Sequence, residues 1–416
     1  MIRSRAMVIP ACLLALSACA AAIDSGQALA ADRTAPEVLS AGVAKPLIAA
    51  QQAIRKKDWD AALADIEQAQ GAAHKTDKDE YDIDDLLAYV LYRQNKYQQA
   101  IAAYEHLLES PLIPERQAAE LGKTIPEMYF RLGDYQKAAQ WAGKYLERHP
   151  DQQDMRNILG DSSFRMGEYR KAAATMQVAA AAAERAGQAP PESWLRIIDD
   201  SYFRLHDIQG MKHALVQLVR YYQRPEDWSE LIDLYSENVH DERVALGYRW
   251  LMFDLGILKR PDDYEDLAFE ALDADVPAEA VQALEQGRQE GLFSGANRVP
   301  GDYGHLLGLV EKRAAESQDS LPRRAAKAAS SAQGQEDVLV GRVYLSEGQY
   351  QKAADALAQG LRKGGVSDAD EAQLSLGIAD LKLGRKAPAD QAFQAVGKSS
   401  PWAGLAELWR LRLAAH

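Results

Sequence analysis

The sequence predicts an all-α protein, a right-handed superhelix of antiparallel helix pairs, on three observations. A short phrase returns along the chain, and its arginines stand 38, 38, 34 and 39 residues apart. An alanine follows most copies at a fixed distance. The composition, 47% hydrophobic and 26% charged over 416 residues, is typical of a folded protein rather than a disordered one. A fixed period of this length is the signature of stacked helical repeats, each of which buries its apolar face against its neighbours.

The recurring phrase ends one helix and begins the next. Each copy holds an aromatic or apolar residue, an arginine, a short turn and then usually an aromatic. Its copies are residues 54–59, 92–97, 130–135, 164–169 and, more loosely, 203–208. In the first four copies an alanine stands three residues after the last aromatic; these are Ala62, Ala100, Ala138 and Ala172. We expect these small residues where the two helices of a pair cross.

The first thirty residues read as a targeting segment, which we set aside from the fold. Arg3 and Arg5 precede a short apolar stretch, too short to span a bilayer as a mature helix. Two cleavage sites remain open. Residues 16–19 have the form of a bacterial lipobox, in which Cys19 would be acylated, and residues 28–30 have the A-x-A form of an ordinary signal peptide. Either cut predicts export to the periplasm, and the first predicts an outer-membrane lipoprotein.

Charge and cysteine content narrow the classes of partner. The formal net charge is −13, which disfavours a nucleic-acid binder or a protein that docks on an anionic membrane surface. We therefore expect contact with a membrane only through the lipid anchor. Both cysteines, Cys12 and Cys19, lie in the leader, so the body has no disulfide and must be held together by packing.

Breaks in the pattern divide the chain. The predicted segments are the targeting segment 1–30, a polar lead 31–42, N-terminal repeats 43–224, degenerate helical pairs 225–290, a Gly/Pro-rich bend 291–304, a helical connector 305–334, C-terminal repeats 335–398 and a capping helix 399–416. The bend holds four glycines and Pro300, the strongest breaker in the chain.

Pieces of one known repeat pattern recur in register. Leu159-Gly160 precedes Ala172 and Met176, and Leu376-Gly377 precedes Ala389 and Phe393 at a similar distance. With the recurring phrase, these make the chain resemble the tetratricopeptide repeat family, over about 43–110, 119–150, 153–222 and 335–398. The resemblance implies a solenoid that binds other chains and seldom does chemistry.

A closer resemblance rests on four segments, residues 43–47, 87–90, 218–222 and 374–384. Through them the chain is similar, from 43 to 414, to exported proteobacterial tetratricopeptide proteins often placed beside TonB energy-coupling components and TonB-dependent receptors. The resemblance implies a partner in TonB-dependent uptake.

No motif typical of an enzyme or a cofactor site stands in the sequence. No two histidines have the i, i+4 spacing of a helical zinc site, and the glycine-rich stretch lacks the Lys-Ser/Thr of a phosphate loop. The acidic stretch 77–85 has Asp82 and Ala88 where a calcium loop needs Gly and Glu. We expect no catalytic residue, no metal and no cofactor.

One surface set remains as a candidate site. Four consecutive repeats place an aromatic beside an arginine: Tyr92 and Arg93, Phe130 and Arg131, Phe164 and Arg165, and Phe203 and Arg204. Arginine can grip carboxylates bidentately and stack on aromatic rings, so a ladder of such pairs would suit a groove that binds protein. Acidic residues expected on the same groove are Asp85, Glu127, Asp154, Asp161 and Asp200. The alternative is structural, because a cation in the last turn of a helix gains about 0.3–1 kcal/mol from the dipole without any partner.

We therefore interpret the chain as a non-enzymatic periplasmic scaffold that docks protein partners. The alternative is a groove that binds an envelope carbohydrate or polymer, or its export machinery, with aromatic rings stacked on sugars.

Overall fold

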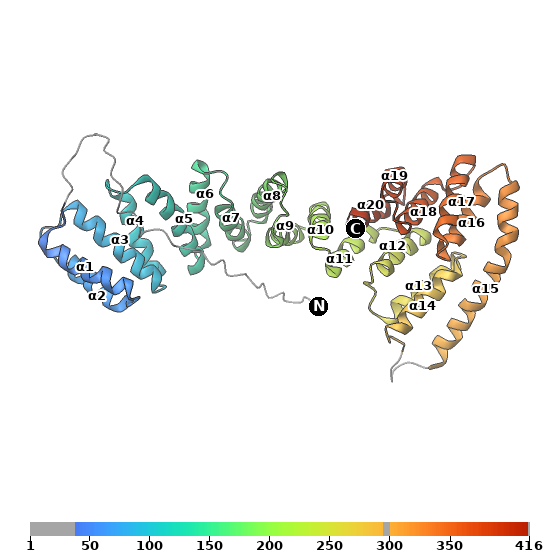
Figure 1. The fold of residues 1–416 in the computed structure, drawn as a ribbon, viewed down its shortest axis with the longest axis horizontal. Helices are drawn as coiled ribbons and strands as arrows, with labels where there is room; N and C mark the ends of the chain where they lie inside the picture. The colour runs from blue at the N-terminus through green and yellow to red at the C-terminus, as the bar shows by residue number, and fades with distance from the viewer. Residues whose placement is uncertain (1–37, 294–299, 415–416) are drawn as a thin grey trace, which may run out of the picture. The chain divides into compact units, whose positions relative to one another are not determined.

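The protein is described by a computed structural model over residues 38–293 and 300–414. Within these residues it forms twenty α-helices and no strand, which confirms the all-α repeat prediction (Figure 1). The targeting segment, with Cys19 and both cleavage sites, lies outside the described residues. None of the helices in the described ranges is long and apolar enough to cross a membrane.

The chain divides into two compact units, with the boundary between Ile113 and Pro114. This boundary lies inside the stretch 43–224, which the sequence treats as one segment. The helices of the first unit are α1 (Ala41–Arg55), α2 (Trp59–Gln70), α3 (Asp77–Arg93) and α4 (Tyr97–Glu109).

The second unit holds the remaining helices. The helices in its N-terminal part are α5 (Glu115–Leu132), α6 (Tyr135–Arg148), α7 (Gln153–Arg165), α8 (Tyr169–Arg185), α9 (Glu192–Leu205), α10 (Ile208–Tyr222), α11 (Pro225–Ser236), α12 (Glu242–Asp254), α13 (Pro261–Asp273) and α14 (Pro277–Gln289). Those that follow are α15 (Pro300–Ser330), α16 (Gln335–Ser346), α17 (Tyr350–Lys363), α18 (Ala369–Lys382), α19 (Lys386–Gln394) and α20 (Ala403–Ala414). The predicted connector is thus one long helix, α15, which begins at Pro300 within the predicted bend.

The recurring phrase forms the same tight turn in every copy. Its fourth residue has left-handed backbone in all five copies; these residues are Lys57, Asn95, Gly133, Gly167 and His206. The next residue closes the turn, as when the Asp134 amide donates to the Tyr129 carbonyl at 3.0 Å. The Asp134 side chain then accepts from the Lys137 amide and caps α6. Local chemistry therefore decides where each first helix ends and each second helix starts.

Small residues sit where paired helices cross, as the sequence predicts. The four alanines that follow the phrase are fully buried. A Cβ placed on Gly160 would lie 2.6 Å from Met176 Cε, and one on Gly377 would lie 2.4 Å from the Phe393 ring. Larger side chains at these positions would push the two helices of the pair apart.

The last helix of the second unit packs against the middle of the chain as well as against α18 and α19. α20 contacts α10, α11 and α12, and Figure 1 shows it beside α11 and α12. One buried apolar cluster joins side chains of α8–α12 to those of α18–α20, with Trp402, Leu405 and Trp409 at most 4% exposed. Asp254 at the end of α12 pairs with Lys382 and, at 3.5 Å, with Arg412 Nε. The C-terminal helices are therefore joined to α12 by both apolar packing and ion pairs.

Candidate functional site

In the first unit, the candidate pair Tyr92–Arg93 connects neighbouring helix pairs. The half-buried Tyr92 ring lies 5.9 Å from the Tyr97 ring that follows the turn. The Arg93 guanidinium lies 5.1 Å from the centre of the Trp59 ring and 6.0 Å from that of Tyr89. Since a cation over an aromatic face is attracted to it, the contact of Arg93 with Trp59 stabilises the packing of α3 on α2.

In the second unit, two aromatic residues of the candidate set pack against other rings and are not fully exposed to solvent. Phe130 meets Tyr135 edge-on at 5.4 Å, and Phe164 meets Tyr169 edge-on at 5.5 Å. Both phenylalanines are half-buried. In each case the first aromatic of the phrase packs on the last one across the turn, so these rings stabilise the corner of a helix pair.

Arg165 makes structural contacts with the preceding helix pair. Its guanidinium lies 5.5 Å from the centre of the Phe130 ring and 5.3 Å from that of Tyr135. Its Nε donates to Asp161 Oδ1 at 3.0 Å, and this pairing opposes the rise that burial causes in the pKa of Asp161. Arg131 is exposed, and it opposes in the same way the rise that burial causes in the pKa of Glu127. Arg165 thus joins α7 to α5 and α6.

The last pair, Phe203 and Arg204, is different. The fifth copy of the phrase ends in Ile208 instead of an aromatic, so Phe203 has no ring to pack against across the turn. Phe203 is 56% exposed and Ile208 39% exposed. Within the described residues, Arg204 makes no ion pair and no ring contact, and it too is exposed. These three residues, which we call the α9 corner, form an open surface of apolar and cationic character.

The first helices of consecutive pairs contact one another along one side of the second unit. We call the side formed by α5, α7, α9 and α11 the first-helix face, because α5 contacts α7 and α7 contacts α9. The two helices α9 and α11 are joined on it by Arg196, which forms a bidentate pair with the fully buried Asp227 at 2.5 and 2.7 Å. Burial acts to lower the pKa of Arg196, but its hydrogen bonds to Asp227 and Glu192 raise it overall.

Asp199 is the one carboxyl on this face with a buried oxygen that no described residue satisfies. Its side chain belongs to a residue only 4% exposed, and Oδ1 has no hydrogen-bond partner in the described part of the chain. Burial, together with the nearby Glu230 and Asp200, raises the pKa of Asp199 to about 8. Asp199 is therefore largely protonated at neutral pH.

The sequence missed Asp199, Arg196 and Asp227 and named the exposed neighbour Asp200 instead. A helical spacing does mark Arg196 and Asp199, because they follow one stripe of α9 with Glu192 and Phe203. That spacing does not say that Asp199 is buried. No such pattern marks Asp227, which lies on α11. The described residues hold no group of three or more His, Cys, Asp or Glu side chains that could bind a metal.

The comparison with protein-family models agrees with this architecture. Residues 127–189 and 340–401 match the family model described as tetratricopeptide repeat, which supports that family for the chain. These segments contain the end of α5, all of α6–α8, more than half of α16 and all of α17–α19.

Among solved structures, the chain is similar to a tetratricopeptide repeat protein from Parabacteroides merdae, with 15% identity, 65% of this chain and 100% of that one covered, and a TM-score of 0.34. It is also similar to the C-terminal part of a TPR repeat-containing protein from Cytophaga hutchinsonii, at 11% identity, 78% and 97% coverage and a TM-score of 0.31. A third is the complex of the TPR2AB domain of yeast Sti1 with pHSP90, at 11% identity, 72% and 97% coverage and a TM-score of 0.25. No curated protein sequence matches the chain.

Proposed function

We propose that this chain is a protein-docking scaffold of the bacterial cell envelope and that a partner binds at the α9 corner. Tetratricopeptide repeat proteins generally mediate protein–protein interactions, which supports the class. The observation that carries the proposal is the exposure of Phe203 and Ile208, where the matching residues of earlier repeats are half-buried. Beside them, the exposed Arg204 makes no ion pair and no ring contact within the described residues. A TonB-system component is the partner that the sequence resemblance favours.

The chemistry of the corner defines what it would bind. Phe203 and Ile208 offer an apolar surface to an aliphatic or aromatic side chain. Arg204 offers a bidentate donor that matches a carboxylate. Nearby cations of the first-helix face are already engaged, Arg165 with Asp161 and Arg196 with Asp227. We therefore propose a partner segment with an apolar residue next to an acidic one.

Photo-crosslinking in cells tests this docking surface. With p-benzoylphenylalanine in place of Ile208, we expect one envelope protein to be captured and identified by mass spectrometry. Combining Phe203→Ala with Arg204→Glu should reduce its yield at least tenfold, because reversing the charge repels the partner's carboxylate. Folding should survive, since exposed substitutions usually change stability by no more than about 0.5 kcal/mol.

The matched control is Phe269, an exposed phenylalanine on α13 that is 52% exposed. A crosslinker at position 269 should not capture the same protein, and Phe269→Ala should leave capture from position 208 unchanged. Equal capture from both positions, or capture that survives the double substitution, would show that the α9 corner is not the docking surface.

We also propose that the protein reaches the periplasm and is held at the outer membrane by lipid on Cys19. Support comes from the lipobox form of residues 16–19. Mass spectrometry of the mature N-terminus should find an acylated Cys19, and the protein should fractionate with membranes. A mature chain that begins at Ala31 would instead show a periplasmic protein without a lipid anchor.

A further inference from the structure

The turns of the recurring phrase lie side by side along one edge of the second unit. The first helices α5, α7 and α9 contact one another in order, so the turns that follow them meet at the same edge. Figure 1 shows these helix pairs following one another in a row. The turns are close, because the Arg165 guanidinium lies 5.5 Å from the centre of the Phe130 ring in the preceding copy. The α9 corner is therefore the last in a row of three neighbouring turns.

The third residue of the phrase changes character between the two units. In the first unit it is polar, since Lys56 is exposed and Gln94 donates to a carboxylate of the preceding helix pair at 2.8 Å. In the second unit it is apolar in all three copies, and we call Leu132, Met166 and Leu205 the turn edge. Leu132 is 45% exposed, and the other two are half-buried. Single exposed apolar residues are ordinary on a protein surface, but a row in register indicates an interaction surface.

The charges beside the turn edge differ between its first two turns and its last. The acidic residue of each of the first two turns is paired with a lysine three residues on, Asp134 with Lys137 at 3.7 Å and Glu168 with Lys171 at 3.1 Å. Arg204 makes no ion pair within the described residues. A partner on this edge thus meets apolar side chains at every turn and an available cation at the α9 corner.

The spacing of the turns limits the conformation of a chain that can touch all three. Packed helices lie about 8–10 Å apart, so neighbouring turns are on the order of 10 Å apart. A polyproline-type segment has three residues per turn and rises about 3.1 Å per residue, so every third side chain faces the same side about 9 Å further on. A docked helix instead buries a stripe about 100° wide and needs a groove. The turn edge is a single row, which suits the extended segment.

We propose that the partner segment docks along the turn edge as an extended, polyproline-type chain, with an apolar residue at every third position and an acidic residue where it reaches Arg204. This inference rests on the proposed function and adds to it the conformation and residue pattern of the bound segment. The half-buried ring pairs of the first two turns, Phe130 with Tyr135 and Phe164 with Tyr169, supply the aromatic surface on which polyproline-type segments dock.

Photo-crosslinking from several positions of the full chain in cells tests the inference. With p-benzoylphenylalanine at position 132, 166 or 205, we expect capture of the same protein as from position 208. Mass spectrometry of the crosslinked peptides should find the captured residues about three positions apart from one turn to the next. Gln188 is the control position, because it lies in the exposed turn between α8 and α9, at the opposite ends of these helices. A crosslinker there should not capture this protein.

A pair of substitutions measures how much the turn edge contributes. Leu132→Gln combined with Met166→Gln gives these two turns a polar residue, as in the first unit. The yield captured from position 208 should fall at least about threefold, because two apolar contacts are lost while the α9 corner stays intact. Val178→Gln is the matched control, since Val178 is an apolar residue of α8 that is 50% exposed, and it should leave the yield unchanged. Circular dichroism should show the same helix content in all variants.

The outcomes separate this inference from the proposed function. Capture from position 208 but not from 132 or 166, or an unchanged yield in the double variant, would overturn docking along the turn edge and leave the α9 corner standing. Captured residues about seven positions apart would show a bound helix and overturn the extended conformation. No capture from any of the four positions would refute the docking surface itself, and this inference with it.

Discussion

A chain that ends at Lys398 is expected to lose the cooperative folding of α10–α19 in the second unit. The truncation removes α20, and with it the buried side chains Trp402, Leu405, Ala406, Leu408, Trp409, Leu411 and Leu413. Full burial of one large apolar side chain contributes about 1.5–3 kcal/mol, so the summed loss is on the order of 10 kcal/mol. That is as large as the whole stability of a typical domain, about 5–15 kcal/mol.

Urea unfolding followed by circular dichroism and size-exclusion chromatography measure this effect. The truncated chain should show an early unfolding transition and should self-associate through the uncovered apolar face of α10–α12. Arg410→Ala is the control on the same helix, because Arg410 is exposed and, among the described residues, forms an ion pair only with the half-exposed Asp390. It should cost no more than about 1 kcal/mol. A truncated chain as stable as the intact one would show that α20 does not complete this core.

Replacing Asp199 by asparagine is expected to raise stability by several kcal/mol above pH 8 and to change it little near pH 4. The folded protein holds the pKa of Asp199 near 8, against about 3.9 in an unfolded chain. Below pH 4 the carboxyl is protonated in both states. Between pH 4 and 8 only the unfolded state releases the proton, so stability falls as the pH rises. Asparagine keeps the shape and removes this loss.

The groups that face Asp199 are Asp200 and Arg196 on α9 and Glu230 and Asp227 on α11. Denaturation at a series of pH values should show that the free-energy difference between variant and parent grows from pH 4 to pH 8 and then levels off. Asp151→Asn, a change in the exposed turn before α7, should leave the profile unchanged. A difference that does not vary with pH would mean that Asp199 ionises normally in the folded protein.

The sequence predicted best the features of the fold that depend only on residues close together in the chain. The left-handed residue of every copy, the capping aspartate of three copies and the buried alanine of four lie within a few positions of one another, so their pattern identifies the turn. The aromatic–arginine set was harder to interpret. Its residues were identified, but the contact of Arg165 with Phe130 depends on how one helix pair stacks on the previous one. The sequence shows that Ile208 stands where the other copies have an aromatic residue. The resulting exposure of Phe203 becomes clear only from the structure, in which the aromatic pairs of the other copies pack on one another.

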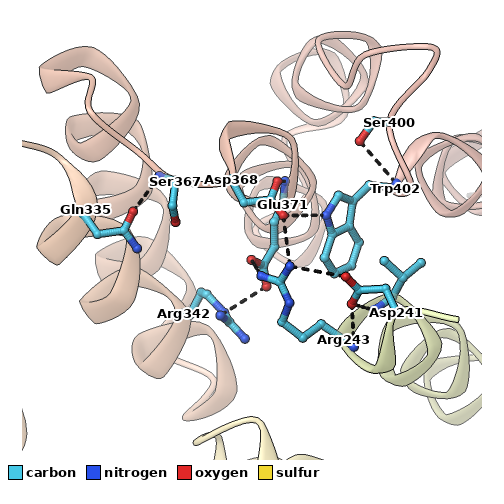
Figure 2. Close-up of polar contacts among 10 residues, drawn as sticks. Asp241, Arg243, Gln335, Arg342, Ser367, Asp368, Glu371, Ser400 and Trp402 are labelled. Atoms are coloured by element: carbon cyan, nitrogen blue, oxygen red, sulfur yellow. Dashed lines mark hydrogen bonds and ion pairs between the residues drawn. The ribbon is translucent and has the colours of Figure 1, made fainter.

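The ion pairs that Glu371 makes with Arg243 and Arg342 (Figure 2) could not be predicted in the same way. These three residues are scattered over more than a hundred positions and share no motif. Helix α20 was expected as a capping helix, but its leucines are buried on several sides, against helices from two parts of the chain. Local periodicity reports that a residue is apolar and does not report which distant helix covers it.

The return of α20 onto α10–α12 also bears on the order in which the protein can fold. Repeats such as α5–α8 make most of their contacts with adjacent helices, so they can form as soon as their own residues are present. Arg412 and Asp254 are 158 residues apart, and Arg243 and Glu371 are 128 apart. Contacts at such separations form late, since a long loop must close first. The apolar face of α10–α12 therefore stays uncovered until the end of the chain arrives, and in this interval the protein is most exposed to aggregation and proteolysis.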